Sequence, residues 1–160
     1  MIQPVKRIVG VDCGAMGAFA LYVDGKLDRV VDMPIVEVVR GGSTKKQVSA
    51  QGVAAVIKEL APTHAFVEKV GAMPNQGVSS MFAFGRAAGV IEGCLSALSV
   101  PITYITPQAW MKATGCGKGK DAIRHRAMEL NPDDQHLFKR VKDSGRADAS
   151  MIAYYGAKHL

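Results

Sequence analysis

Three acidic residues lie in segments of this sequence that are otherwise apolar, and any stable fold has to accommodate them. Asp12 directly follows the apolar run 5–11, and Glu68 interrupts the run 64–70. Asp148 lies in an apolar segment near the C-terminus. A carboxylate near a core costs free energy unless it is paired with a cation or bound to a metal. The fold must therefore give these acids a shared partner or leave them at the surface.

A partner shared by all three acids predicts a metal site. If the two strands are neighbours and the last helix packs across their ends, Asp12, Glu68 and Asp148 converge into a cage of oxygen atoms. Such a cage suits Mg²⁺ or Mn²⁺, which prefer carboxylate and water ligands. Two such ions about 4 Å apart catalyse phosphodiester hydrolysis. The alternative is that Asp12 and Glu68 pair with nearby basic residues and that Asp148 faces solvent.

The hydrophobic pattern predicts an α/β domain with a mixed sheet. Strands are expected over 5–11 and 18–23, and Asp24-Gly25 predicts a tight turn into a third strand over 27–33. Residues 40–46 are interpreted as a basic loop and 131–145 as a polar connection. Further strands are expected over 64–70 and 101–105, and helices over 48–60, 78–98, 121–130, from Thr106-Pro107 onward and from Arg146 to the C-terminus.

Length and composition narrow the class of protein. With 160 residues the chain fits a single domain, 1–160, and is too short for a two-lobed nucleotide kinase or actin-like ATPase. The formal charge of +6 favours a polyanionic partner such as nucleic acid. Three cysteines without a CxxC pair support neither a disulfide framework nor a zinc ribbon. No uncharged run is long enough for a membrane span, and we expect a cytoplasmic protein.

Four motifs follow one another along the chain: the strand Ile8-Val-Gly-Val-Asp12-Cys-Gly before a hairpin, Phe66-Val-Glu68, the loop 71–77 before a glycine-containing helix, and Arg146-Ala-Asp148-Ala. In this order they resemble the RuvC family of Holliday junction resolvases. The resemblance implies a ribonuclease H-like fold, with a central mixed five-stranded sheet flanked by helices. It also implies a homodimer without a nucleotide cofactor that makes paired Mg²⁺-dependent cuts in a four-way DNA junction. The small size is similar to that of resolvases carried by bacteriophages.

The resemblance assigns catalytic and metal-binding roles to Asp12, Glu68 and Asp148, which would hold two Mg²⁺ ions. Members of the family commonly have a further acid one helical turn before the last one, but that position is Gly145 here. Asp143 is the nearest candidate for a fourth ligand if the helix begins after it, with Ser144 as a cap. The alternative for Asp143 is a charged loop residue.

Basic residues cluster between 112 and 126. Lys112 and Lys120 match lysines that the family uses near the scissile phosphate, so we assign both to catalysis and DNA contact. Lys118 and Arg124 are further DNA-binding candidates, and a solvated basic face is the alternative for all four.

The loop that follows Glu68 is expected to enter the junction. Its DNA-binding candidates are Met73, the only bulky apolar side chain available to wedge a base step, together with Lys69, Asn75 and Gln76. Ordinary loop polarity explains the two amides equally well.

A stripe of glycines, Gly85, Gly89 and Gly93, recurs every four residues in the long helix. Tight packing on the sheet is the simpler interpretation, and a partner helix in a twofold dimer is the one that the resemblance favours. Trp110 is expected to be a core anchor.

The leading hypothesis is a structure-selective endodeoxyribonuclease that resolves four-way and related branched DNA junctions. One alternative is a ribonuclease H-like nuclease that acts on RNA or RNA/DNA hybrids. Another is a non-catalytic junction-binding module, which the missing acid at Gly145 motivates.

Overall fold

A mixed five-stranded sheet in the order β3-β2-β1-β6-β7 forms the centre of the computed structural model, which describes residues 1–160. Strands β1, β2 and β3 form an antiparallel meander, and β1 pairs in parallel with β6, which pairs in parallel with β7. The expected α/β class and mixed sheet are therefore confirmed. The bounds of the strands are β1 Arg7–Asp12, β2 Ala18–Val23, β3 Lys26–Asp32, β6 His64–Glu68 and β7 Ile102–Ile105.

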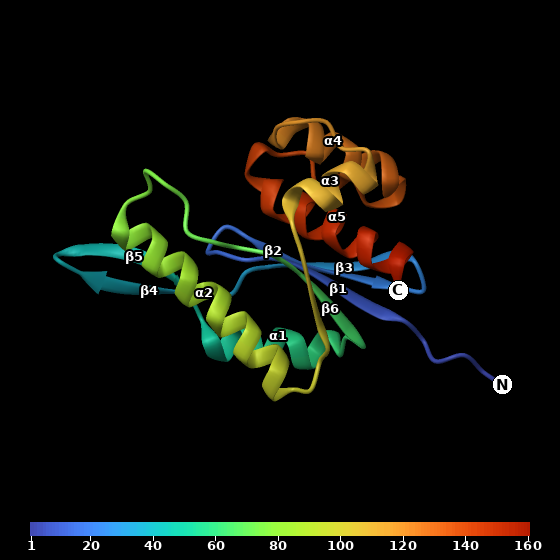
Figure 1. Ribbon diagram of the computed structural model, residues 1–160, viewed down its shortest axis with the longest axis horizontal. Helices are drawn as coiled ribbons and strands as arrows, with labels where there is room; N and C mark the ends of the chain where they lie inside the picture. The colour runs from blue at the N-terminus through green and yellow to red at the C-terminus, as the bar shows by residue number, and fades with distance from the viewer.

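Helices cover both faces of this sheet (Figure 1). One face packs against α1 and α2 in a core that includes Val9 and Val11 of β1. The opposite face packs against α3, α4 and α5, and it includes Ile8 of β1. Alternate residues of β1 therefore serve the two cores, as a strand buried on both faces requires. The bounds of the helices are α1 Ala50–Leu60, α2 Val78–Ala97, α3 Pro107–Thr114, α4 Lys120–Leu130 and α5 Ser144–His159.

The turns and caps follow the local sequence signals. Asp24 and Gly25 both adopt positive φ between β2 and β3, which confirms the predicted tight turn. The Thr106 hydroxyl accepts a hydrogen bond from the Ala109 N–H at the start of α3. None of the helices is long and apolar enough to span a membrane.

The interpretation of residues 40–46 as a loop was wrong. Residues Ile35–Arg40 form β4 and Ser43–Val48 form β5, and the two strands pair only with each other, beside the first half of α2 (Figure 1). Gly41 and Gly42 both adopt positive φ, the conformation that a two-residue hairpin turn requires. The polar content of this segment concealed its strand character.

Other boundaries shift by a few residues. The expected polar connection 131–145 contains two 3₁₀ segments, Pro132–Leu137 and Val141–Asp143, and α5 begins at Ser144 rather than Arg146. Strand β6 ends at Glu68, so this acid lies at the end of the strand rather than within it.

The expectation that the glycine stripe packs on the sheet was also wrong. A Cβ atom at Gly85, Gly89 or Gly93 would meet nothing within 4 Å. The buried face of α2 is instead formed by Ala87, Ile91 and Leu95. The glycine face of α2 is therefore open to solvent.

Candidate active site

The carboxyl ends of two adjacent parallel strands place Asp12 and Glu68 side by side. The register pairs Val11 of β1 with Val67 of β6, and each acid is the next residue in its strand. Because the two strands run in the same direction, both acids lie at the same edge of the sheet. Such edges are where ligands bind in many open α/β sheets.

Helix α5 brings the third acid to this edge. It can lie directly on β1 because Gly10 has no side chain: a Cβ there would be 2.3 Å from the Ala149 carbonyl oxygen and 2.3 Å from the Ala153 nitrogen. Asp148, next to Ala149, is thereby held against the end of β1. The sequence expectation that the last helix crosses the strand ends is confirmed.

The three acids form one electrostatically coupled cluster. Burial raises the pKa of Asp12 well above its usual range, and the charges of Asp148 and Glu68 raise it further. Burial also raises the pKa of Asp148 to about 7, with Glu68 as the next contributor. Lys120 lowers the pKa of both Asp12 and Asp148, so its ammonium group belongs to the same cluster. This arrangement excludes the alternative in which Asp148 faces solvent.

These acids are chemically suited to a divalent cation. The Oδ1 atom of Asp148 is buried without a hydrogen-bond partner, and an uncompensated carboxylate in such a place requires a cation or a proton. The carboxylates do not, however, form a closed coordination shell, because no group of three or more His, Cys, Asp or Glu side chains is arranged to hold an ion. The donor set fits a hard ion such as Mg²⁺ in chemistry, and the side chains have to close around it.

Trp110 holds Glu68 in place, which the sequence interpretation missed. Its indole Nε1 donates a hydrogen bond to the Oε2 atom of Glu68 at 3.0 Å. Trp110 is only 2% exposed and belongs to the core under α3, as expected. Burial raises the pKa of Glu68, and this hydrogen bond lowers it because it favours the ionised form. The tryptophan is thus both a core anchor and a positioning residue.

Asp143 does not join the other acids. Arg140 donates hydrogen bonds to both of its carboxylate oxygens, from the guanidinium and from the backbone N–H. Burial acts to raise the pKa of Asp143, but these hydrogen bonds outweigh it and hold the pKa below its usual value. The structure therefore contradicts the assignment of Asp143 as a fourth ligand, since its lone pairs are already occupied.

The structure also explains why the family's usual acid is missing at Gly145. A Cβ at this position would be 2.2 Å from the Met16 carbonyl oxygen, in the turn between β1 and β2. No side chain fits there without moving the backbone.

The predicted basic residues divide into three groups. Lys120, the first residue of α4, is the one coupled to the acids. Lys112 and Lys118 are exposed and lie in α3 and in the loop before α4. Arg124 is 7% exposed and donates to the carbonyl oxygens of Phe138 and Lys139. Its assignment to DNA binding was therefore wrong, because its guanidinium is buried in a structural role.

The loop between β6 and α2 is exposed next to the acids except at Val70, which packs against the core. Lys69, Met73, Asn75 and Gln76 all lie in solvent. A cavity of about 430 Å³ begins at Glu68 and Lys69 and continues along the open face of α2 to Gly85 and Gly89. These side chains are free to meet a ligand that approaches the acid cluster.

Comparison with known proteins identifies the fold. No protein-family model and no curated protein matches this chain in sequence. RuvC of T. thermophilus in complex with a Holliday junction substrate matches in structure with a TM-score of 0.61 and 18% identity, over 94% of each chain. The fowlpox virus Holliday junction resolvase has a TM-score of 0.54 and 17% identity, over 96% of this chain and 99% of that one. The yeast mitochondrial Holliday junction resolvase has a TM-score of 0.51 and 12% identity, over 100% of this chain and 83% of that one.

The chain therefore has the ribonuclease H-like fold of RuvC and other Holliday junction resolvases, and the expected fold is confirmed.

Proposed function

We propose that this protein is a structure-selective endodeoxyribonuclease that cuts four-way and related branched DNA junctions by divalent-metal-dependent hydrolysis. One observation carries the proposal: three half-buried, electrostatically coupled carboxylates meet at the edge of a sheet that matches RuvC over 94% of the chain. Carboxylates whose pKa values are raised by partial burial and by neighbouring acids are typical of functional centres. The +6 charge of the chain agrees with a DNA substrate.

Asp12, Glu68 and Asp148 are the residues that would hold two Mg²⁺ ions, for which Mn²⁺ would substitute. Bound Mg²⁺ supplies Lewis acidity for the attack of water on the phosphodiester. Trp110 orients Glu68 through its indole N–H, and partial burial desolvates the carboxylates of Asp12 and Asp148. The ammonium group of Lys120 neutralises charge on the scissile phosphate.

DNA contacts outside the acid cluster are proposed for exposed residues only. Lys112 and Lys118 would bind phosphates of the strand that is cut. Lys69, Met73, Asn75 and Gln76 lie beside Glu68, where they would meet the branch point of the junction. Arg124 and Asp143 are left out because both side chains are already engaged within the protein.

A homodimer is part of the proposal, since a junction with twofold symmetry presents two equivalent strands to be cut. The open face of α2 supports it. Gly85, Gly89 and Gly93 leave this face smooth, and Val78 and Phe82 on the same face are 88% and 67% exposed. An apolar, side-chain-poor helix face allows close approach of a second helix.

Cleavage of a synthetic four-way junction, with and without Mg²⁺, tests the function. The wild type should cut symmetrically related strands in Mg²⁺ and none in chelator. Asp12→Asn should lower the rate at least about 100-fold while junction binding persists. Asp28→Asn, an exposed acid on β3, is the matched control and should leave the rate unchanged.

Two outcomes would contradict the proposal. Faster cleavage of an RNA/DNA hybrid than of any branched DNA would indicate a ribonuclease instead. Junction binding in chelator, with no cleavage in Mg²⁺ or Mn²⁺, would indicate a non-catalytic binding module.

A further inference from the structure

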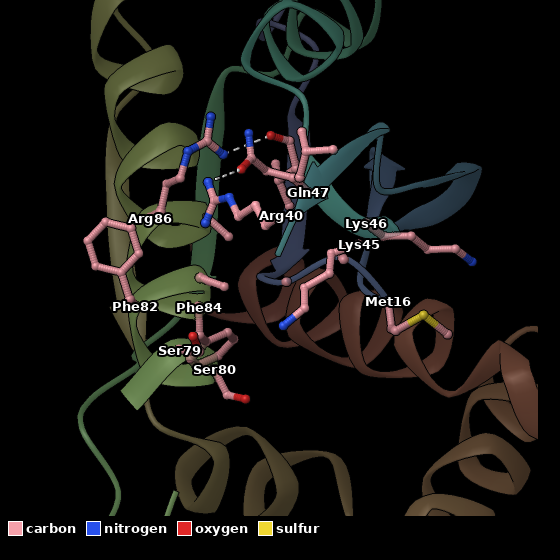
Figure 2. A pocket seen from close by; sticks show the side chains of 16 residues that line it. Met16, Arg40, Lys45, Lys46, Gln47, Ser79, Ser80, Phe82, Phe84 and Arg86 are labelled. Carbon is pink, nitrogen blue, oxygen red and sulfur yellow. Dashed lines mark hydrogen bonds between the residues drawn. The ribbon is translucent and has the colours of Figure 1, made fainter. Parts of the chain in front are cut away.

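A second groove lies on the side of the molecule where the β4–β5 hairpin faces α2. It encloses about 560 Å³ between β4, β5, the first part of α2 and the turn after β1 (Figure 2). The turn contributes Gly14, Ala15 and Met16, which follow the acid Asp12 by only a few residues. The groove therefore starts beside the acid cluster and leads away from it along the hairpin.

The lining of this groove is strongly cationic. Of its 16 residues none is acidic, and four are basic: Arg40, Lys45, Lys46 and Arg86. None of these four forms a salt bridge. Their positive charge is therefore not compensated within the protein, which favours an anionic ligand.

Strand pairing decides which cations point into the groove. Val38 pairs with Lys45 and Arg40 pairs with Ser43, so Arg40 and Lys45 lie on the same face of the hairpin. Lys46 lies on the opposite face, where it pairs with Glu37. Figure 2 shows Arg40 and Lys45 extending from the hairpin on the side of α2.

The hairpin is held at a defined distance from α2. The Nη1 atom of Arg86 donates to the Val48 carbonyl oxygen at 2.9 Å, and Arg40 donates to the Oε1 atom of Gln47 at 3.0 Å. These hydrogen bonds are drawn as dashed lines in Figure 2. A two-stranded hairpin is marginally stable alone, and the bond from Arg86 to Val48 is the one of the two that joins it to α2.

The rest of the lining suits a nucleic-acid backbone. Ser79 and Ser80, in the first turn of α2, supply hydroxyl groups and belong to a helix terminus with free backbone N–H groups. Phe84, Ala83 and Ala87 form an apolar floor for sugar carbons. Hydroxyls, helix termini and arginines are the groups that most often contact phosphate and sugar in protein–DNA complexes.

We propose that this groove binds the sugar–phosphate backbone of a duplex DNA arm, with the exposed Arg40 and Lys45 as phosphate contacts. The inference rests on the proposed function, since it takes branched DNA as the ligand, but it concerns binding at a distance from the acids. The groove would fix the direction in which an arm leaves the cleavage site. The contacts are to the backbone, so they should not depend on base sequence.

The test compares Arg40→Ala/Lys45→Ala with Lys26→Ala/Lys58→Ala, a control that removes the same charge from exposed positions on β3 and α1. Binding of fluorescent four-way junctions is measured in chelator at several salt concentrations. The groove variant should bind roughly tenfold more weakly than the control, and its slope of log affinity against log salt should be shallower by about 2. Thermal unfolding checks that both variants are folded.

Arm length adds a second readout. The wild type should lose affinity when the arms are shortened from about two helical turns to less than one, because short arms do not reach along the hairpin. The groove variant should be nearly insensitive to the same change.

The remaining outcomes distinguish failure of the groove inference from failure of the proposed nuclease function. The groove variant could match the control in affinity, salt slope and arm-length dependence while the wild type cuts junctions. The groove inference then fails and the nuclease function stands. If the wild type binds long arms through the groove but cuts no junction, the inference holds and the nuclease function fails. Loss of RNA duplex binding with unchanged DNA binding would assign the groove to RNA and overturn the inference, and absence of any DNA binding would overturn both.

Discussion

Asp148 carries a proton close to neutral pH in the metal-free protein, because burial and the charge of Glu68 raise its pKa to about 7. An acid whose pKa is raised by folding binds its proton more tightly in the folded chain than in the unfolded chain. The free energy of unfolding is therefore highest below the ordinary pKa of 3.8 and falls as the pH rises through about 7. A bound cation would displace this proton and remove the penalty.

Asp148→Asn should therefore stabilise the metal-free protein at about pH 8, by a few kcal/mol, and should have little effect near pH 4. The measurement is thermal unfolding in chelator at both pH values, with Asp28→Asn as the control. Adding Mg²⁺ at about pH 8 should stabilise the wild type but not the variant. A wild-type stability that rises between pH 4 and 8 relative to Asp148→Asn would contradict this account of the site.

Trp110→Phe removes the hydrogen bond to Glu68 and keeps most of the aromatic volume. We expect a higher Mg²⁺ requirement for cleavage, because Glu68 loses the partner that orients it and favours its ionised form. The loss of stability should be about 1 kcal/mol. Tyr22→Phe removes a buried hydrogen bond to Asn131 and serves as the control. An equal effect of both variants on the Mg²⁺ requirement would show that Trp110 has only a structural role.

At the scale of single elements, glycines decide how closely α5 and α2 approach their surroundings. At two glycines the backbone lies directly against another backbone segment. Gly10 contacts the backbone at Ala149, and Gly145 contacts the backbone at Met16. A Cβ atom at Gly93 in α2 would have no neighbouring atom within 4 Å. The same residue type thus permits contact in α5 and leaves a surface open in α2.

Gly145→Ala and Gly93→Ala should therefore have opposite effects on stability. The first places a Cβ 2.2 Å from the Met16 carbonyl oxygen and should destabilise the protein by about 2 kcal/mol or more. The second adds a better helix former in open space and should stabilise the monomeric fold by up to about 1 kcal/mol. Chemical denaturation of both variants measures the difference. A neutral Gly145→Ala would show that the turn after β1 is free to move.

At the scale of the whole molecule, one face of the fold has no partner within the chain. The apolar and glycine-rich face of α2 extends from Val78 through Gly85 and Gly89 to Gly93, away from both cores. The cavity that begins at Glu68 reaches this face at Gly85 and Gly89, and Phe82 on this face also lines the hairpin groove, so a second copy bound here would border both sites.

Gly89→Arg should disrupt the proposed dimer by placing a charged side chain on its smoothest part. Sedimentation velocity should then show a monomer where the wild type shows a dimer, and paired junction cuts should become single nicks. Ala55→Arg, an exposed position on α1, is the control and should stay dimeric. An unchanged sedimentation coefficient for Gly89→Arg would place any dimer contact on another face.

Local patterns were sufficient for the parts of this protein that depend on neighbouring residues. The turn at Asp24-Gly25, the cap at Thr106 and the strands that carry Asp12 and Glu68 all follow from short stretches of sequence, because turn, cap and strand preferences act over a few residues. The β4–β5 hairpin was missed because β5 is polar along most of its length, so the segment after the apolar strand β4 was interpreted as a loop rather than as a second strand.

By itself, the chain's sequence determined the class of fold and the three acids, since buried strands ending in carboxylates allow few arrangements. Only the tertiary structure decided that Trp110 donates a hydrogen bond to Glu68 and that Arg140 donates hydrogen bonds to Asp143. It also decided that Arg124 is buried and that no side chain fits at Gly145. These outcomes depend on distances between side chains and backbone that packing sets to within an ångström. Neither hydrophobic periodicity nor motif spacing contains that information.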